Sequence, residues 1–286
     1  MVRTMLLACA WLALAGAAPA PSPTPSPDAA AEAMFARAKQ YWQARRDVPY
    51  LRYGALVRYL HKGHVFDNWW DAYERTADKA LALEPLLDPV ENNRRLGGVP
   101  FSIFGITIFD TNPDAEPIRL DEPRIDPTSS FGVSGRGTGV TLPAGGAEAS
   151  PQPGDLREIT RVEASTRDYQ ISIAGTDRLG DVDAIHLKFV PLTDPAINRL
   201  RELWLDPQTY RTIQAKVQGI LSGKPYDGVE WTVRYTVVDG RNYLQQLIAD
   251  EPLHFGLDTT IAKFEYDFVD YHFPDTVPKF TFDRPF

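Results

Sequence analysis

Apolar and polar residues alternate along several stretches of this chain. Between Val229 and Val237 every second residue is apolar, and residues 51–59 and 264–268 follow the same pattern. Because successive side chains of a β-strand point to opposite faces, each stretch predicts a strand with one apolar and one largely polar face. The chain is therefore expected to build a sheet that buries one of its two faces.

Strand-like runs continue through most of the chain, and turn sequences separate many of them. They lie at residues 51–59, 65–76, 156–164, 169–175, 184–190, 199–205, 212–221, 229–238, 243–249 and 261–269. Gly63 and the pair Asp239-Gly240 suit tight hairpins. About ten short strands joined in this way predict a mainly β, antiparallel meander and not a βαβ fold. Such a sheet with one apolar face has to curl into a barrel, split into a sandwich or wrap around another element.

Residues 1–17 have the features of a secretory signal peptide. Arg3 supplies the positive start, an apolar run follows, and small residues permit cleavage after Ala17. The alternative is a lipoprotein signal that leaves a lipid-anchored Cys9 as the new N-terminus. We therefore expect a protein located in the periplasm or elsewhere outside the cytoplasm. Because Cys9 is the one cysteine of the chain, a disulfide framework and a multi-cysteine zinc site are excluded.

Two segments that follow the signal peptide set the domain organisation. Residues 18–27 alternate proline with small residues and are expected to form an extended tether. After Asp28, a suitable N-cap, apolar residues recur at helical spacing to about Arg46, which predicts an amphipathic helix that docks on the domain's own sheet. Residues 28–286 then form one domain, in which the Pro- and Gly-rich residues 100–153 are a loop-rich insertion with one apolar run.

The sequence contains no recognisable catalytic or metal-binding motif. His61 and His64 face each other across a predicted hairpin, but no cysteine or third nearby histidine completes a metal site, so we interpret both as solvated turn residues. His186 shares a strand face with Lys188 and is expected to be exposed. The run 132–139 (GVSGRGTG) lacks the hydrolase elbow and the phosphate-loop lysine, which favours a flexible loop. We predict no catalytic residue, no metal and no cofactor.

Two blocks of the sequence together resemble one known family. The first, residues 35–78 (FARAKQYWQARRDVPYLRYGALVRYLHKGHVFDNWWDAYERTAD), reads as a helix, a long strand, a hairpin and a second strand. The second, residues 184–217 (AIHLKFVPLTDPAINRLRELWLDPQTYRTIQAKV), reads as a succession of strands joined by turns. Behind a signal peptide, this order of elements is similar to the LolA/LolB superfamily of periplasmic lipoprotein-sorting proteins.

The resemblance implies an architecture and a ligand. In that family an incomplete antiparallel barrel curls around an apolar cavity, helices cover it as a lid, and acyl chains bind inside. For this chain the resemblance implies a half-barrel of about ten strands with an N-terminal amphipathic helix, and with residues 100–153 as a lid-like insertion. The insertion makes the chain longer than the family pattern, and no residue here is assigned to the family's lid-contacting arginine.

On this basis we predict a carrier, not an enzyme, that binds a lipid or a lipoprotein acyl chain and takes part in outer-membrane lipoprotein sorting. The inward-facing residues expected to contact the acyl chain are Tyr53, Val57, Tyr59, Trp231, Val233, Tyr235, Phe264 and Phe268. The alternatives are an envelope-stress sensor or protein-interaction module with the same fold, and an enzyme built on it. A closed core without a cavity is the alternative explanation for the same eight residues.

The charge of the chain limits its partners. Thirty Lys and Arg residues against 38 Asp and Glu residues give a formal net charge of −8, so nucleic acid and anionic membranes exert no chain-wide attraction. An apolar ligand needs no such attraction, since each buried CH₂ group contributes about 0.8 kcal/mol. We expect a monomer that binds a lipid or acyl chain, contacts the membrane transiently, has an envelope protein as a further partner and binds no nucleic acid.

Overall fold

The alternating stretches of the sequence form the strands of one large sheet. The computed structural model describes residues 27–77, 80–85, 101–103, 106–109, 124–134, 160–195, 197–219, 229–255 and 259–282. The helical segments are α1 (Pro27–Gln43) and the short 3-10 helix η3 (Lys279–Phe282). The strands are β1 (Tyr50–His61), β2 (His64–Arg75), β3 (Ala80–Pro85), β4 (Phe101–Ile103), β5 (Ile106–Phe109), β6 (Ser129–Ser134), β7 (Thr160–Glu163), β8 (Tyr169–Leu179), β9 (Val182–Pro191), β10 (Leu200–Leu205), β11 (Thr212–Gln218), β12 (Glu230–Val238), β13 (Arg241–Ala249), β14 (Leu253–Phe255) and β15 (Thr259–His272).

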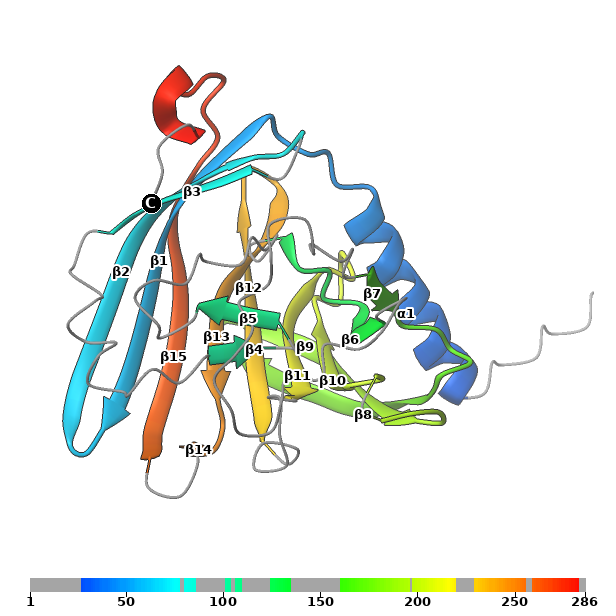
Figure 1. Ribbon diagram of the computed structural model, residues 1–286. Coiled ribbons are helices and arrows are strands. Elements are labelled where there is room, and N and C mark those ends of the chain that lie inside the picture. The colour runs from blue at the N-terminus through cyan, green and yellow to red at the C-terminus, as the bar shows by residue number, and fades with distance from the viewer. Residues whose placement is uncertain are drawn as a thin grey trace, which may run out of the picture.

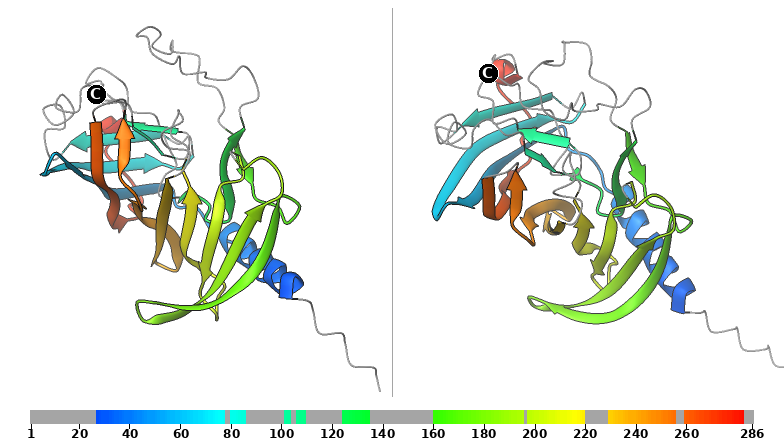
Figure 2. Two further views of the ribbon diagram at one scale, coloured as in Figure 1. Left: turned by 90° about the horizontal axis from the view of Figure 1, so that it is seen from below. Right: turned by 60° about the horizontal axis from the view of Figure 1, so that its bottom comes forward.

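Strand pairing joins distant parts of the chain into an open sheet of eleven strands. The order is β3-β2-β1-β15-β13-β12-β11-β10-β9-β8, with β14 paired to β15 off this path. Every pairing in it is antiparallel. Strands β3 and β8 are the two edges and do not pair with each other, which confirms the predicted incomplete antiparallel barrel. Figure 1 shows the sheet strongly curved, and Figure 2 shows the small two-stranded sheets β4–β5 and β6–β7 on its concave side.

Tight turns form where the sequence predicts them. Gly63 has a φ of 79° and its neighbour Lys62 a φ of 49°, and together they connect β1 to β2. Asp239 and Gly240 have φ values of 50° and 74° and connect β12 to β13. Two successive residues with positive φ are typical of the turn that matches the twist of a two-residue hairpin. Both hairpins are therefore confirmed.

The predicted N-terminal helix is confirmed as α1, and its apolar stripe docks on the sheet. Ala31, Phe35 and Ala38 lie one helical turn apart and are buried. The Phe35 ring packs edge to face on Phe189 of β9, with the ring centroids 5.0 Å apart. In Figure 1 the helix runs beside the β8–β10 end of the sheet, far from β1 and β2. The helix therefore covers one end of the concave face.

The long segment that was expected to lack regular structure contains strands. Its apolar run forms the hairpin β4–β5, and β6 pairs with β7. The interpretation of residues 132–139 as a loop is wrong for residues 132–134, which belong to β6. The signal peptide, the Cys9 alternative and the tether up to residue 26 lie outside the described residues. Of the described helices, neither has the length and apolar character to cross a membrane.

The outer, convex face of the sheet is polar. On it, the Arg52 guanidinium binds both carboxylate oxygens of Asp71, with a shortest N–O distance of 2.6 Å. Trp69 and Trp70 are neighbours on β2 and point to opposite faces, as expected for a strand. Trp69 is 37% exposed on the convex side, whereas Trp70 packs against the core. The alternation of the sequence thus separates a charged face from an apolar one.

Candidate ligand-binding face

A continuous row of apolar side chains crosses the concave face. Residues directly opposite each other in neighbouring strands share one face of a sheet, and the pairings connect one such residue from each of eight strands. From β1 to β8 this apolar row is Val57, Tyr266, Leu247, Val233, Ala215, Leu203, Leu187 and Ile173. All of them are buried except Ile173 on the edge strand β8. The row thus joins eight strands of the sheet through one apolar residue of each.

A first group of aromatic rings lies beside the apolar row. Tyr59 and Phe264 are opposite each other on β1 and β15. The Trp231 ring meets Phe264 edge to face, with the centroids 5.7 Å apart. Gly219, directly after β11, makes room for this indole, because a Cβ atom at this position would collide with Trp231 Nε1. The position of Trp231 therefore depends on a residue without a side chain.

A second aromatic group, the tyrosine group, lies where β1 begins and β15 ends. The Tyr53 ring is 5.9 Å from the rings of both Phe268 and Tyr271. Tyr243 of β13 stacks on Tyr271 at 5.0 Å and on Phe273 at 5.4 Å. These rings extend the apolar face toward the connection between α1 and β1.

The structure brings the eight predicted contact residues together. Tyr53, Val57, Tyr59, Trp231, Val233, Tyr235, Phe264 and Phe268 belong to one buried apolar cluster, and none is more than 3% exposed. Their placement in one cluster is observed, whereas their role in ligand binding stays a prediction. Because these side chains are shielded from water, a ligand can reach them only when the groups packed against them move apart.

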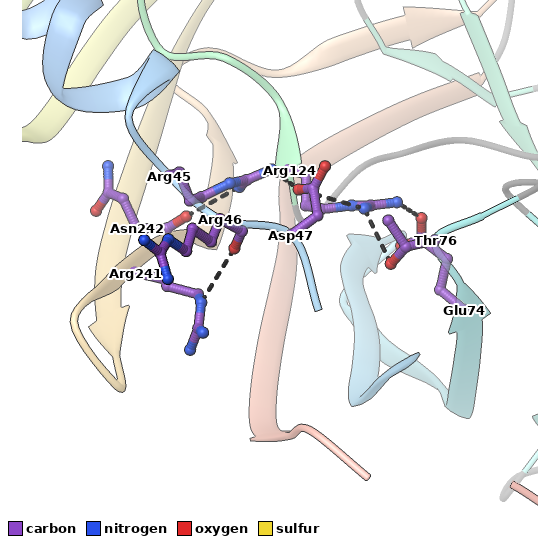
Figure 3. A network of polar contacts seen from close by, with 8 residues as sticks. All are labelled: Arg45, Arg46, Asp47, Glu74, Thr76, Arg124, Arg241 and Asn242. Atoms are coloured by element: carbon purple, nitrogen blue, oxygen red, sulfur yellow. Dashed lines mark hydrogen bonds and ion pairs between the residues drawn. The ribbon is translucent and has the colours of Figure 1, made fainter. Parts of the chain in front are cut away.

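An ion pair lies inside the apolar face near the tyrosine group. Glu74 is opposite Leu51 in the β1–β2 pairing and therefore points to the concave side. Its carboxylate pairs with the guanidinium of Arg124, as Figure 3 shows, and the Arg124 side chain is 6% exposed. Arg124 also donates a hydrogen bond to the Thr76 hydroxyl at 3.2 Å. Neither partner of this ion pair was among the predicted site residues.

Two more arginines reach the same place from the α1–β1 connection and from β13. The Arg45 guanidinium donates to the backbone carbonyl of Asn242 at 3.3 Å and lies 3.4 Å from Asp47 Oδ1. The same Asp47 oxygen is 3.8 Å from the Arg124 guanidinium. Arg241 donates to a backbone carbonyl of the α1–β1 connection at 3.1 Å. We call Arg45, Arg124 and Arg241 the arginine cluster (Figure 3).

Burial and neighbouring charges shift the pKa values of this region. Burial lowers the pKa of Arg124, the Asp47 carboxylate opposes that shift, and the nearby positive charge of Arg45 adds to it. Burial raises the pKa of Tyr243, and the positive charges of Arg45, Arg241 and Arg124 all oppose this shift. All three guanidiniums therefore act on one phenol of the tyrosine group.

A second buried arginine lies at the α1 end of the concave face. Arg199, directly before β10, is 2% exposed, and its backbone N–H donates to the Ser130 carbonyl of β6 at 2.8 Å. Burial lowers the pKa of Arg199 to about 10, against the opposing effect of Tyr169. Burial also raises the pKa of Tyr169, whose hydroxyl accepts a hydrogen bond from the Leu200 N–H at 3.3 Å. Both ends of the face thus hold a buried guanidinium.

The interpretation of the hairpin histidines is wrong for one of the two. His61 is 7% exposed, and its Nδ1 lies 2.8 Å from the carbonyl oxygen of Thr260 on β15. It is buried because β15 pairs with β1, a contact that the local hairpin pattern does not contain. His64 is exposed, as expected. In the part of the chain that the structure describes, no three His, Cys, Asp or Glu side chains form a group that could hold a metal ion.

His186 was expected to be exposed, but it is buried on the convex face, with 9% of its surface exposed. Its ring stacks on Trp204 of the paired strand, with the centroids 4.4 Å apart. Its two ring nitrogens lie 2.9 Å from an Asp177 carboxylate oxygen and 2.8 Å from a Glu202 carboxylate oxygen. The expectation failed because it treated the strand in isolation, whereas side chains of the two neighbouring strands cover the imidazole.

Comparison with known proteins gives matches among solved structures alone, since no family model and no curated protein matches the chain. The chain is similar to a DUF1329 family protein from Desulfovibrio piger, with 12% identity over 90% of this chain and 98% of that chain and a TM-score of 0.44. It is similar to a LolA superfamily protein from Nitrosomonas europaea, with 15% identity over 88% and 96% and a TM-score of 0.33. It is also similar to an outer membrane lipoprotein-sorting protein domain from Vibrio parahaemolyticus, with 10% identity over 88% of this chain and 97% of that chain and a TM-score of 0.42. The similarity to LolA-type structures spans most of the chain, concerns the fold alone and transfers no function.

Proposed function

We propose that this protein is a carrier outside the cytoplasm that binds the acyl chain of a lipid or a lipoprotein on its concave face, without catalysing a reaction. The observation that carries the proposal is the apolar row, which runs without interruption across the strands of an unclosed sheet. Sorting of lipoproteins to the outer membrane is the role we propose for such a carrier.

The apolar face can supply the binding free energy that an acyl chain needs. Each CH₂ group removed from water contributes about 0.8 kcal/mol, so a chain of about 16 carbons gains on the order of 10 kcal/mol before ordering costs. Aromatic rings add contact area at low cost in side-chain entropy, and both aromatic groups flank the row. No charge attraction to the chain is required.

Ligand entry requires the concave face to open. The two edge strands β3 and β8 are not joined by a ladder of hydrogen bonds, so the two ends of the sheet can separate without breaking a strand pair. α1 packs on the sheet at its β8–β10 end, and in Figure 1 the second part of the face, formed by β1 and β15, lies away from this helix. We place the acyl chain on that second part of the face.

Quenching of tryptophan fluorescence by brominated palmitate tests the proposal. The chain has six tryptophans, and Trp231 lies on the proposed face whereas Trp69 lies on the convex face. Bromine quenches an indole at contact distance, so we expect saturable quenching that is markedly reduced in Trp231→Phe and unchanged in Trp69→Phe. The matched replacements keep an aromatic ring at each position.

Two results would contradict the proposal. One is a folded protein that shows no saturable quenching by brominated palmitate, which is also what the sensor and interaction-module alternative expects. The other is quenching that Trp231→Phe leaves intact, since the ligand would then not contact the part of the face at Trp231. Organic-solvent extraction of the purified native protein followed by mass spectrometry identifies the acyl lipid that it carries.

A further inference from the structure

The arginine cluster is a local excess of positive charge in an acidic protein. The formal net charge of the chain is −8. At the cluster, however, the guanidiniums of Arg45 and Arg124 pair with the carboxylates of Asp47 and Glu74, and the guanidinium of Arg241 donates to the backbone carbonyl of Arg46, as Figure 3 shows. The guanidiniums of Arg45 and Arg124 lie 3.4 Å and 3.8 Å from the same Asp47 oxygen, so their charges are concentrated at one place. Such a concentration of buried positive charge is stabilised by a further anion.

Asp47 holds this place loosely. Its Oδ1 lies 3.4 Å from Arg45 and 3.8 Å from Arg124, and its side chain is 59% exposed. A charge-assisted hydrogen bond between a guanidinium and a carboxylate is about 2.7–2.9 Å long. Within this protein, the guanidinium of Arg52 and the carboxylate of Asp71 come within 2.6 Å of each other, although the Arg52 side chain is more exposed than that of Arg45. A carboxylate or phosphate that comes closer than Asp47 would therefore bind the two guanidiniums more strongly.

The cluster adjoins the proposed acyl-chain face. The Arg45 guanidinium lies over the Tyr243 ring at 5.6 Å and over the Trp42 ring at 4.2 Å. Tyr243 stacks on Tyr271, which in turn lies 5.9 Å from Tyr53. A ligand whose chain lies along the apolar row and whose head lies at the cluster would thus contact apolar and cationic groups in the order in which an amphiphile presents them.

Building on the proposed function, we propose that Arg45 and Arg124 bind the anionic head group of the ligand, a carboxylate or a phosphate monoester, and that Asp47 holds this position while no ligand is bound. Guanidinium forks suit both anions because each offers two oxygens to parallel N–H donors. Glu74 keeps Arg124 in place from the buried side. The ligand class is therefore a single-chain anionic amphiphile.

Three probes with the same hydrocarbon chain test this proposal: palmitate, hexadecyl phosphate and the uncharged hexadecanol. Each is titrated against a bound fluorescent fatty acid in the full-length protein. We expect Arg45→Gln to weaken palmitate and hexadecyl phosphate about tenfold and to change hexadecanol less than twofold. Asp47→Asn removes the competing carboxylate and is expected to tighten both anionic probes severalfold. Arg52→Gln, which removes an arginine of the convex face, is the matched control and should change none of the three.

The outcomes separate the two proposals. Arg45→Gln weakening all three probes equally would show a structural role for the arginine and would overturn the head-group site, as would equal binding of palmitate and hexadecanol in the unaltered protein. If the unaltered protein binds none of the probes, the proposed function itself fails. If the Arg124→Gln variant folds, its affinities for the same three probes test the second arginine of the site. If Arg124→Gln does not fold, the Asp47→Asn variant still decides the test, because Asp47 is largely exposed.

Discussion

The two ends of the concave face are covered in different ways. At the α1 end, small and aromatic residues of a helix pack on the sheet, with Phe35 against Phe189 and Tyr169 completing the contact at 5.6 Å from Phe189. At the arginine end, the ion pair of Glu74 and Arg124 sits among tyrosine rings. The first end is closed by apolar packing, which water does not replace. The second end is closed by charges, which another anion can replace.

The buried arginines at the two ends show the same contrast. Burial lowers the pKa of both, and at Arg124 the Asp47 carboxylate acts against this shift, whereas at Arg199 the opposing group is the phenol of Tyr169. A carboxylate carries a full negative charge that can pair with a buried guanidinium, whereas a neutral phenol carries none. The segment of residues 124–134 connects the two ends, because Arg124 contacts Glu74 and Ser130 accepts a hydrogen bond from Arg199.

Replacing Phe35 by alanine is expected to have the largest effect. The ring is 1% exposed and packs on Phe189, so the substitution leaves a cavity at the α1 end and should lower the free energy of unfolding by about 4 kcal/mol. Urea unfolding followed by circular dichroism measures this change in the free energy of unfolding. Gln40→Ala on the exposed side of the same helix is the control and should change stability by less than about 0.5 kcal/mol. A loss below about 1 kcal/mol for Phe35→Ala would mean that α1 does not close this end.

Breaking the ion pair at the other end is expected to cost about 3 kcal/mol. Glu74→Ala leaves the Arg124 guanidinium buried beside apolar groups, and the remaining carboxylate of Asp47 is too distant to compensate it. The double variant Glu74→Met and Arg124→Met removes both charges and should be more stable than Glu74→Ala. Equal or lower stability of the double variant in the same urea titration would contradict the view that uncompensated charge is the cause.

Between the two ends, Gly219→Ala tests how tightly the face is packed. The added Cβ atom collides with the Trp231 indole, which has to shift, and overpacking of this kind costs about 1–3 kcal/mol. We expect a loss of about 2 kcal/mol together with a change in tryptophan fluorescence. Gly63→Ala, at a turn with open space around it, also loses stability through its positive φ but should leave the tryptophan spectrum unchanged. Identical tryptophan spectra for both variants would argue against tight packing around the Trp231 indole.

The smallest effect concerns Asp126 in the connecting segment. Burial raises the pKa of Asp126, against hydrogen bonds from the Thr128 N–H and hydroxyl, so the folded protein keeps the proton to a higher pH than the unfolded chain does. Stability therefore falls as the pH rises through this window, and the loss persists at neutral pH. Asp126→Asn keeps the acceptor oxygen but cannot ionise. We expect it to be more stable by less than about 1 kcal/mol at pH 7, with the difference vanishing below about pH 4. A difference that does not depend on pH would contradict this assignment.

Local pattern was sufficient for most strands but not for the short ones. β12 and β15 were predicted because their alternation is long, and Asp239-Gly240 marks the turn between β12 and β13. β3 and β14 were not predicted, because three to six residues carry too little periodicity to be distinguished from a loop. Strand bounds were also missed in both directions: β8 continues beyond the predicted residue 175 to Leu179 through exposed residues, whereas β11 ends at Gln218, before the predicted residue 221.

The candidate site was predicted in its apolar part and missed in its charged part. A readable signal existed for Glu74, which shares the strand phase of Trp70 and Ala72 and thus places a carboxylate on the apolar face. No such signal existed for Arg124. It lies near the middle of the long Pro- and Gly-rich segment, and its partner is 50 positions earlier in the chain, so that neither propensity nor periodicity connects the two.

Alternation of residue types decides to which face each side chain points, because the period of two is a property of the extended backbone itself. That much could be read from Val57 or Trp231 without coordinates. Which strands become neighbours is decided by the folded chain as a whole, as when β15 closes on β1 more than 200 residues earlier. Such pairing depends on loop closure and packing over the entire sheet, which no local window contains. For the same reason, the burial of His186 under Trp204 and the meeting of Arg45 and Arg124 at Asp47 emerge only in the tertiary structure.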